Sequence, residues 1–232
     1  SNNEIKKEIN LNKYVELKNI SFSYENNNDF ALSNINLKIF NGDKIGIIGR
    51  SGSGKTTLIN IILGLIKPNN GEIIIDEKKI NFDNFTWSNN LGYVPQETYL
   101  IDDTIKKNIL FGVEENIETL KKLESVAKKS QIFDFVMSQK KKFDTEVGER
   151  GVNLSIGQRQ RIGIARALYR NPKIIVFDES TSSLDFETEK NFINDVFEQN
   201  QDETIIFISH KKDALIKCNK IYDLNKKNFS KE

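Results

Sequence analysis

One pattern, Gly-x-x-x-x-Gly-Lys-Thr at residues 49–56, limits the folds open to this chain more than any other feature. The pattern matches the phosphate-loop consensus at every defined position. A short apolar segment, 44–48, precedes it, and apolar residues at helical spacing follow it in 57–63. A phosphate-binding loop requires this placement between a buried strand and a helix N-terminus. A Gly/Ser-rich turn with an unrelated lysine would not explain both flanking segments.

The residue types in this loop predict how it binds a nucleotide. Its glycines let the backbone turn sharply and aim its N–H groups at one point, where the helix N-terminus adds partial positive charge. Lys55 supplies a full charge for the outer phosphates, and the Thr56 hydroxyl is placed for Mg2+. The residues predicted to contact the nucleotide are Gly49, Ser51, Gly52, Ser53, Gly54, Lys55, Thr56 and Thr57.

Composition narrows the class of protein. The 232 residues suit one large domain, with or without a subdomain. Lys and Arg number 34 against 33 Asp and Glu, so no basic excess indicates nucleic acid as a partner. Cys218 is the single cysteine and cannot form an internal disulfide, which fits a reducing cytoplasmic setting. No apolar run approaches the about 20 residues that cross a bilayer.

The two ends of the chain differ in character from its middle. Residues 1–13 are polar and charged, lack the apolar core of a signal peptide, and are predicted to be a linker. We expect the domain itself to span 14–224 and residues 225–232 to form a tail. A charged linker of this kind is typical of a domain boundary, so we expect the chain to be part of a longer protein.

The hydrophobic pattern predicts an α/β fold. Segments 14–24 and 31–40 alternate as strands do, and a hairpin-like turn is expected at 41–43. Apolar runs at 174–177 and 204–208 read as buried strands. Strands that alternate with helices predict a parallel core sheet. Ahead of these two apolar runs, helical spacing over about 97–170 predicts a mostly helical subdomain.

Two acidic residues, Asp178 and Glu179, end the first of these buried strands. Phosphoryl transfer to water needs a metal-binding carboxylate and a group that positions the water. We predict Asp178 as a metal ligand and Glu179 as the general base, with the side chains diverging as in extended chain. The alternative is a pair of surface acids, although buried strands seldom end in paired acids without a use. His210, the only histidine, follows the second buried strand. At that position, a catalytic role and a structural role are equally open.

The motif at 154–161, Leu-Ser-Ile-Gly-Gln-Arg-Gln-Arg, resembles the ABC signature, which ordinary phosphate-loop ATPases lack. The other motifs stand along the chain in the order that the family has. Tyr24 matches the aromatic A-loop residue, Gln96 the Q-loop, 182–185 the D-loop, and His210 the switch histidine. By this resemblance, which covers nearly the whole chain, it is identified as the nucleotide-binding domain of an ABC transporter.

The resemblance implies a fold and a mechanism. The fold is a phosphate-loop NTPase core with a mixed or parallel sheet, an antiparallel β-subdomain and a helical signature subdomain. Two such domains pair head-to-tail, so ATP lies between the phosphate loop of one and the signature of the other. Ser155, Gly157 and Gln158 would then contact the nucleotide of the partner domain. Ser155 can also be read simply as a helix cap, and the two readings are compatible.

The family motifs also imply individual roles. Tyr24 would stack on adenine, although it could be a core aromatic at a strand end. Gln96 would contact Mg2+ or the attacking water, although it could be a solvent-facing loop amide. His210 would bond the γ-phosphate and Glu179, and Asp185 would shape the dimer interface.

One position departs from the commonest signature, which has glycine where this chain has Ile156. If its side chain points away from phosphate, little is lost. If it points toward phosphate, the Cβ atom would restrict close approach of the backbone and slow turnover.

Two loops hint at the kind of transporter. Residues 145–151 resemble the X-loop of exporters, whose membrane domains contact this region. Residues 99–105, with Asp-Asp-Thr, resemble flippases of lipid-linked oligosaccharides and polysaccharides, although 102–104 could equally form a helix cap. We expect an ATPase at the cytoplasmic face of the inner membrane, partnered by transmembrane domains. The alternatives are a multidrug, lipid or peptide exporter, a soluble ABC ATPase that acts on nucleic acid or ribosomes, and a kinase.

Overall fold

The computed structural model describes residues 7–24, 31–80, 85–180, 186–200, 202–209 and 215–231. The strands are β1 (Lys7–Glu8), β2 (Tyr14–Phe22), β3 (Leu32–Phe40), β4 (Lys44–Ile48), β5 (Asn70–Ile75), β6 (Lys78–Lys79), β7 (Phe85–Thr86), β8 (Leu91–Val94), β9 (Ile174–Asp178), β10 (Thr204–Ile208), β11 (Lys220–Asp223) and β12 (Asn228–Lys231). The helices are α1 (Lys55–Ile62), α2 (Ile105–Ile109), α3 (Ile117–Lys129), α4 (Phe133–Ser138), α5 (Ile156–Leu168) and α6 (Phe186–Gln199), with short 3-10 turns at Ser88–Asn90, Lys142–Asp144 and Glu149–Gly151.

A six-stranded sheet forms the centre of the molecule, in the order β12-β11-β4-β10-β9-β8. All its pairs are parallel except β11 with β12. The predicted parallel core is therefore confirmed, and the carboxyl ends of β4, β9 and β10 meet at one edge of the sheet. Register places Ile208 beside both Ile47 and Asp178, which brings the phosphate loop and the acidic pair to that edge.

A second sheet, β3-β2-β5-β6, is antiparallel. The hairpin-like turn expected at 41–43 was wrong, because β3 pairs with β2 whereas the next strand, β4, pairs with β10 and β11. The turn instead carries the chain from one sheet to the other. Asp43 holds it: its Oδ2 accepts from the N–H of Phe40 at 2.9 Å and from Lys220 Nζ at 2.9 Å.

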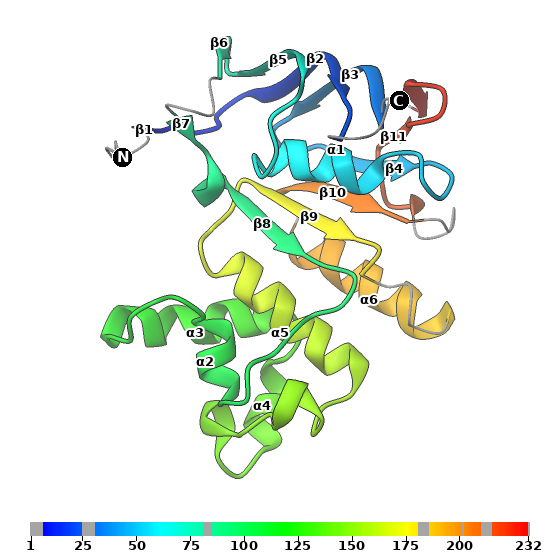
Figure 1. Cartoon of the computed structure of the whole chain (residues 1–232). Helices are drawn as coiled ribbons and strands as arrows, with labels where there is room; N and C mark the ends of the chain where they lie inside the picture. The colour runs from blue at the N-terminus through cyan, green and yellow to red at the C-terminus, as the bar shows by residue number, and fades with distance from the viewer. Residues whose placement is uncertain are drawn as a thin grey trace.

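The central sheet separates two hydrophobic cores, because neighbouring residues of its strands face opposite sides. Ile174, Val176 and Ile206 pack with the antiparallel sheet and α1. Ile175 and Phe177 pack on the other side with the helices. Figure 1 shows the result, with the antiparallel sheet and α1 on one side of β9 and β10, and α3, α5 and α6 on the other.

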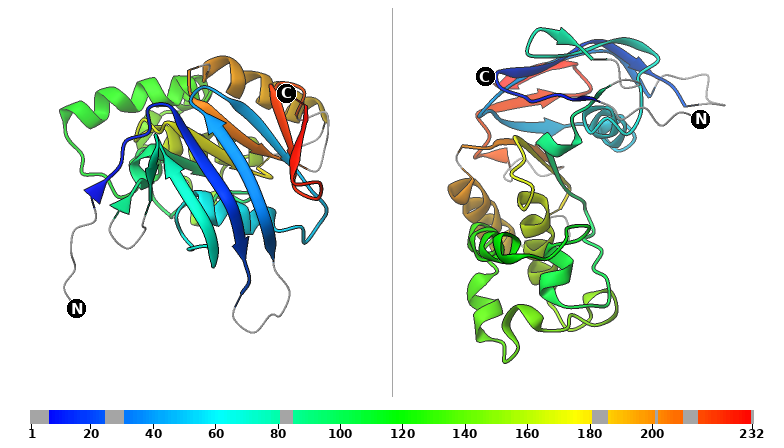
Figure 2. Two further views of the ribbon diagram at one scale, coloured as in Figure 1. Left: turned by 90° about the horizontal axis from the view of Figure 1, so that it is seen from above. Right: turned by 90° about the vertical axis from the view of Figure 1, so that its left-hand side faces the viewer.

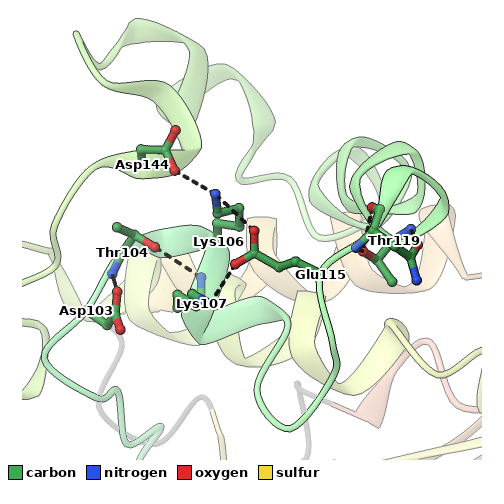
Figure 3. A network of polar contacts seen from close by, with 8 residues as sticks. Asp103, Thr104, Lys106, Lys107, Glu115, Thr119 and Asp144 are labelled. Atoms are coloured by element: carbon green, nitrogen blue, oxygen red, sulfur yellow. Dashed lines mark hydrogen bonds and ion pairs between the residues drawn. The ribbon is translucent and has the colours of Figure 1, made fainter.

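The predicted helical subdomain is also present, as α2 to α5. Figure 2 shows these helices extending away from the two sheets. An ion-pair cluster joins its loops: Lys106 Nζ lies 2.8 Å from Asp144 Oδ1 and 3.3 Å from Glu115 Oε2, and Lys107 Nζ lies 2.7 Å from Glu115 Oε1. In Figure 3 these residues lie around the first turn of α2, which Thr104 caps by accepting from the N–H of Lys107 at 3.2 Å.

The fold extends past both expected domain boundaries. Within the predicted linker, Leu11 is only 1% exposed, and the carboxylate of Asp76 accepts from the N–H groups of Asn12 and Lys13 at 2.7 Å each. Within the predicted tail, β12 pairs with β11. Polar composition concealed both contributions, since backbone N–H groups and one buried leucine are enough to anchor a segment.

Among the helices in the part of the chain that the structure describes, none combines the length and apolar character needed to cross a membrane.

The close approach of β5 to β2 gives a first testable prediction. Gly71 has φ +95°, and a Cβ atom there would lie 2.5 Å from the carbonyl oxygen of Asn19 and 2.6 Å from that of Lys18. Gly71→Ala should lower the free energy of unfolding by about 3 kcal/mol, because two backbone groups must move. Gly42→Ala is the matched control: its φ is +87°, but nothing lies within 4 Å, so only about 1 kcal/mol is expected. Equal losses in chemical denaturation would contradict the predicted clash.

Candidate nucleotide-binding site

The phosphate loop lies where the sequence predicted it, between β4 and α1. Gly54 precedes the helix with φ +93°, and a Cβ atom there would lie 2.4 Å from the carbonyl oxygen of Ala31. No side chain caps α1, and its first turn holds no acid. The first N–H groups of a helix need partners, so an uncapped N-terminus beside a glycine loop is suited to an anion.

A buried hydroxyl inside the loop also suits a phosphate ligand. Ser53 Oγ is buried and makes no hydrogen bond within the described structure. A Cβ atom on Gly49 would lie 2.4 Å from this oxygen, so the loop leaves no room for a side chain at that position. A buried polar atom without a partner is costly, and a phosphate oxygen would satisfy it.

Lys55 lies at the centre of the site and is 7% exposed. Its Nζ donates to the carbonyl oxygens of Gly49 and Arg50, both at 3.1 Å. The same nitrogen lies 3.8 Å from Glu179 Oε1. The loop lysine and the predicted general base, more than a hundred residues apart in sequence, are therefore neighbours.

The acidic pair corrects one detail of the prediction. Asp178 is the last residue of β9, but Glu179 is not extended: its φ is +48°, and its N–H donates to the carbonyl of Ile208 at 3.1 Å. The two carboxylates therefore diverge through a left-handed turn rather than through the strand's alternation. Burial raises the pKa of Asp178, and Glu179 adds to this rise, while the hydrogen bond from Tyr93 and the charge of Lys55 oppose it.

The residues present fit a magnesium ion that is completed by the nucleotide. Within the described ranges, no group of three or more His, Cys, Asp or Glu side chains could hold a metal by itself. Mg2+ is commonly bound through one or two carboxylates together with substrate phosphates and water. Asp178 would provide the carboxylate, and the exposed Thr56 at the start of α1 would provide a hydroxyl. When bound, the ion would neutralise phosphate charge.

Tyr24 lies two residues after the end of β2, beside α1. Its hydroxyl and Thr57 Oγ1 are 3.0 Å apart, and its ring makes an edge contact with Phe22 at 4.9 Å between centroids. Because Tyr24 is 47% exposed, it is not a core aromatic, and its ring is available to a planar ligand.

Gln96 follows β8 on an exposed loop. It lines a cavity of about 730 Å3 together with Tyr99, Arg150 and Ile156. The side chain of Ile156 is 43% exposed and faces this cavity, between the segments predicted as the Q-loop and the X-loop. The extra side chain in the signature therefore has room on that side.

The signature turn begins α5 as a capped helix. Ser155 Oγ accepts from the N–H of Gln158 at 3.2 Å, and Gln158 Oε1 accepts from the N–H of Ser155 at 2.9 Å, which together form a capping box. A Cβ atom on Gly157 would meet nothing within 4 Å, so the turn is open. No hydrogen bond in the described part of the chain joins these three residues to the phosphate loop. The prediction that Ser155 caps a helix is confirmed. The space beside Gly157, at the N-terminus of that helix, is empty.

Two residues that the sequence reasoning missed contact the acidic segment. Tyr93 on β8 donates from its hydroxyl to Asp178 Oδ2 at 3.0 Å. Gln160 on α5, 2% exposed, donates from Nε2 to the carbonyl of Ser180, next to Glu179. The alternation of β8 could have indicated Tyr93, but the contact of Gln160 depends on helix packing.

The predicted roles of His210 and Asp185 concern positions outside the described residues. Ser209, just before the histidine, is buried at the end of β10, between β4 and β9 in the sheet.

Comparisons with known proteins agree with this geometry. A family model described as ABC transporter matches residues 32–182. The chain is 38% identical over 89% of its length to an alpha-hemolysin translocation ATP-binding protein of Escherichia coli, and it covers 29% of that protein. It is 41% identical over 85% of its length to the mouse ATP-binding cassette sub-family B member 5, and it covers 16% of that protein.

Two further relatives are bacterial. A putative multidrug export ATP-binding/permease protein of Staphylococcus aureus is 38% identical over 89% of this chain, which covers 36% of it. The structure of a bacterial Atm1-family ABC exporter with ATP bound superposes on the whole chain with a TM-score of 0.84 and 31% identity, and the chain covers 40% of it. The chain thus spans less than half the length of each of these relatives. It belongs to the ABC transporter family, as an ATP-hydrolysing, ATP-binding domain of the exporter type.

Proposed function

We propose that this chain is the Mg2+-dependent ATPase motor of a membrane exporter, located at the cytoplasmic face of the inner membrane. The observation that carries the proposal is the meeting of Lys55, Asp178 and Glu179 at one edge of the parallel sheet. A phosphate-binding cation, a carboxylate for the metal and a second carboxylate for the attacking water are the groups that hydrolysis of ATP requires.

Each side chain then has a distinct task. Lys55 exchanges its two carbonyl partners for the outer phosphates, and Ser53 and the first N–H groups of α1 add donors. Tyr24 stacks on adenine. Glu179 takes the proton of the attacking water, and Gln96 and His210 orient that water and the γ-phosphate.

The site is proposed to be half of a composite site. Ser155, Gly157 and Gln158 make an open, capped turn at the start of α5, with no described contact to the chain's own phosphate loop. A second copy in head-to-tail orientation would place this turn over the γ-phosphate, where a helix N-terminus is favourable. Asp185 would lie at that interface.

The transmembrane partner is proposed from the relatives. Their names describe translocation or export, and this chain covers only part of each. The cavity beside Gln96 and the 149–152 segment is the surface proposed to receive the membrane domains. A role on nucleic acid lacks support, because Lys and Arg number 34 against 33 acidic residues.

We propose two alternative cargo classes. The first is a lipid-linked oligosaccharide or polysaccharide, and this proposal rests on the resemblance of residues 99–105 to flippases. However, Thr104 caps α2 and Asp103 Oδ1 accepts from the N–H of Thr104 at 2.7 Å, so local hydrogen bonds account for both residues. Export of polypeptides or drugs fits the names of the relatives equally well. Measuring translocation of each cargo class by the full-length protein in proteoliposomes distinguishes the two proposals.

The phosphate role of Lys55 gives a second prediction. Lys55→Ala should weaken ATP binding at least about tenfold, because two or more charge-assisted hydrogen bonds are lost. Binding of a fluorescent ATP analogue measures the change. Lys79→Ala, which removes an exposed lysine paired with Glu72 at 2.6 Å, is the control and should bind ATP as the wild type does. Unchanged affinity in Lys55→Ala would contradict the phosphate-loop assignment.

The general-base role of Glu179 gives a third prediction. Glu179→Gln should keep ATP affinity but slow hydrolysis about 100-fold or more, since the amide cannot accept the proton. The ATP-bound dimer should then accumulate, as measured by light scattering with and without ATP. Glu124→Gln, on the exposed face of α3, should change neither quantity. Wild-type turnover in Glu179→Gln would remove Glu179 from this role.

A further inference from the structure

The strand next to β9 carries a tyrosine aimed at the metal-binding carboxylate. In the parallel pairing of β8 with β9, Tyr93 lies beside Val176. Asp178 is two residues further along β9 than Val176, so it projects from the same face of the sheet. Both side chains therefore stand on the face that carries α1 and the phosphate loop, since Val176 packs in that core.

The residues beside Tyr93 fix this orientation. Gly92 and Val94 face the helical side: Val94 is fully buried there, and a Cβ atom on Gly92 would lie 3.0 Å from Pro172 Cγ and 3.1 Å from the Ala167 carbonyl. A register shift of one residue would force a large ring into that tight contact. The packing of β8 on α5 therefore holds the tyrosine on the nucleotide side.

The contact itself is well formed. The Tyr93 hydroxyl donates to Asp178 Oδ2 at 3.0 Å, and within the described structure it is the one hydrogen-bond donor to this carboxylate. One carboxylate oxygen is thereby occupied, and Oδ1 remains for another ligand.

We propose that Tyr93 is a positioning residue, which holds the Asp178 carboxylate by Oδ2 and presents Oδ1 to the Mg2+ of the ATP complex. Partners that hydrogen-bond to a metal ligand fix its orientation, and their loss commonly weakens metal binding. A carboxylate on a short side chain at a strand end otherwise rotates freely about its last bond, which reduces the fraction that is ready to bind. Tyr93 is three residues before Gln96, so the strand that positions the carboxylate also leads into the Q-loop.

This inference rests on the proposed function and names one more residue of the same site. The test is Tyr93→Phe in the full-length protein, because this change removes only the hydroxyl and keeps the ring. Mn2+ replaces Mg2+ as the probe, and its binding to the protein saturated with a non-hydrolysable ATP analogue is followed by electron paramagnetic resonance. Affinity for the same analogue in EDTA is measured separately.

We expect Mn2+ to bind about three- to tenfold more weakly to Tyr93→Phe, which is less than the usual about ten- to hundredfold because the tyrosine is 39% exposed. Affinity for the analogue in EDTA should be unchanged, since Tyr93 contacts the metal ligand rather than the phosphate loop. The matched control is Tyr14→Phe, a tyrosine on β2 whose ring packs against Phe40 and Lys38 and belongs to neither the nucleotide site nor the cavity beside Gln96. It should match the wild type in both measurements.

Equal Mn2+ affinity in wild type and Tyr93→Phe would overturn the positioning role, as would an equal loss in Tyr14→Phe. A loss of analogue affinity in EDTA would also overturn it, because the tyrosine would then support the pocket in general. If the wild type itself bound neither analogue nor Mn2+, the proposed ATPase site would fail first, and the two failures are thus distinguished.

Discussion

The site depends on one constraint, the parallel pairing of β4, β10 and β9. Because parallel strands end at the same edge, the residue after each strand reaches a common space. The phosphate loop leaves β4 there, and the acidic pair ends β9 there, so Lys55 and Glu179 lie 3.8 Å apart although 124 positions separate them in the chain. Each group reaches the other through a short turn, with Gly54 at φ +93° before Lys55 and Glu179 itself at φ +48°.

That edge is rigid because the sheet is buried on both faces. Alternate residues of β9 supply two cores: Val176 packs toward α1, and Ile175 and Phe177 pack toward the helical layer. The strand cannot rotate without exposing one set of side chains, so the direction of the acidic pair is set by apolar packing. Polar contacts then refine it, with Tyr93 on one side and the turn at Glu179, bonded to Ile208, on the other.

The helical layer carries an exposed signature turn at the start of α5. The signature turn satisfies itself through the Ser155–Gln158 capping box, while Gly157 has empty space beside it. The same helix, α5, reaches back to the acidic segment through Gln160 and the Ser180 carbonyl. One helix, α5, thus carries both the open signature turn and the contact to the residue after Glu179.

Local pattern determined the chemistry and the element types: the loop at 49–56, the acids after a buried run, and the signature at a helix start were all readable, because short motifs and apolar periodicity encode them. Tertiary structure alone decided which sheet β4 joins, the left-handed turn at Glu179, and the contacts of Tyr93 and Gln160. It also drew Leu11 and β12 into the fold. These features depend on strand order and long-range packing, which local sequence pattern does not encode, and the alternation of β8 indicates only the face on which Tyr93 lies.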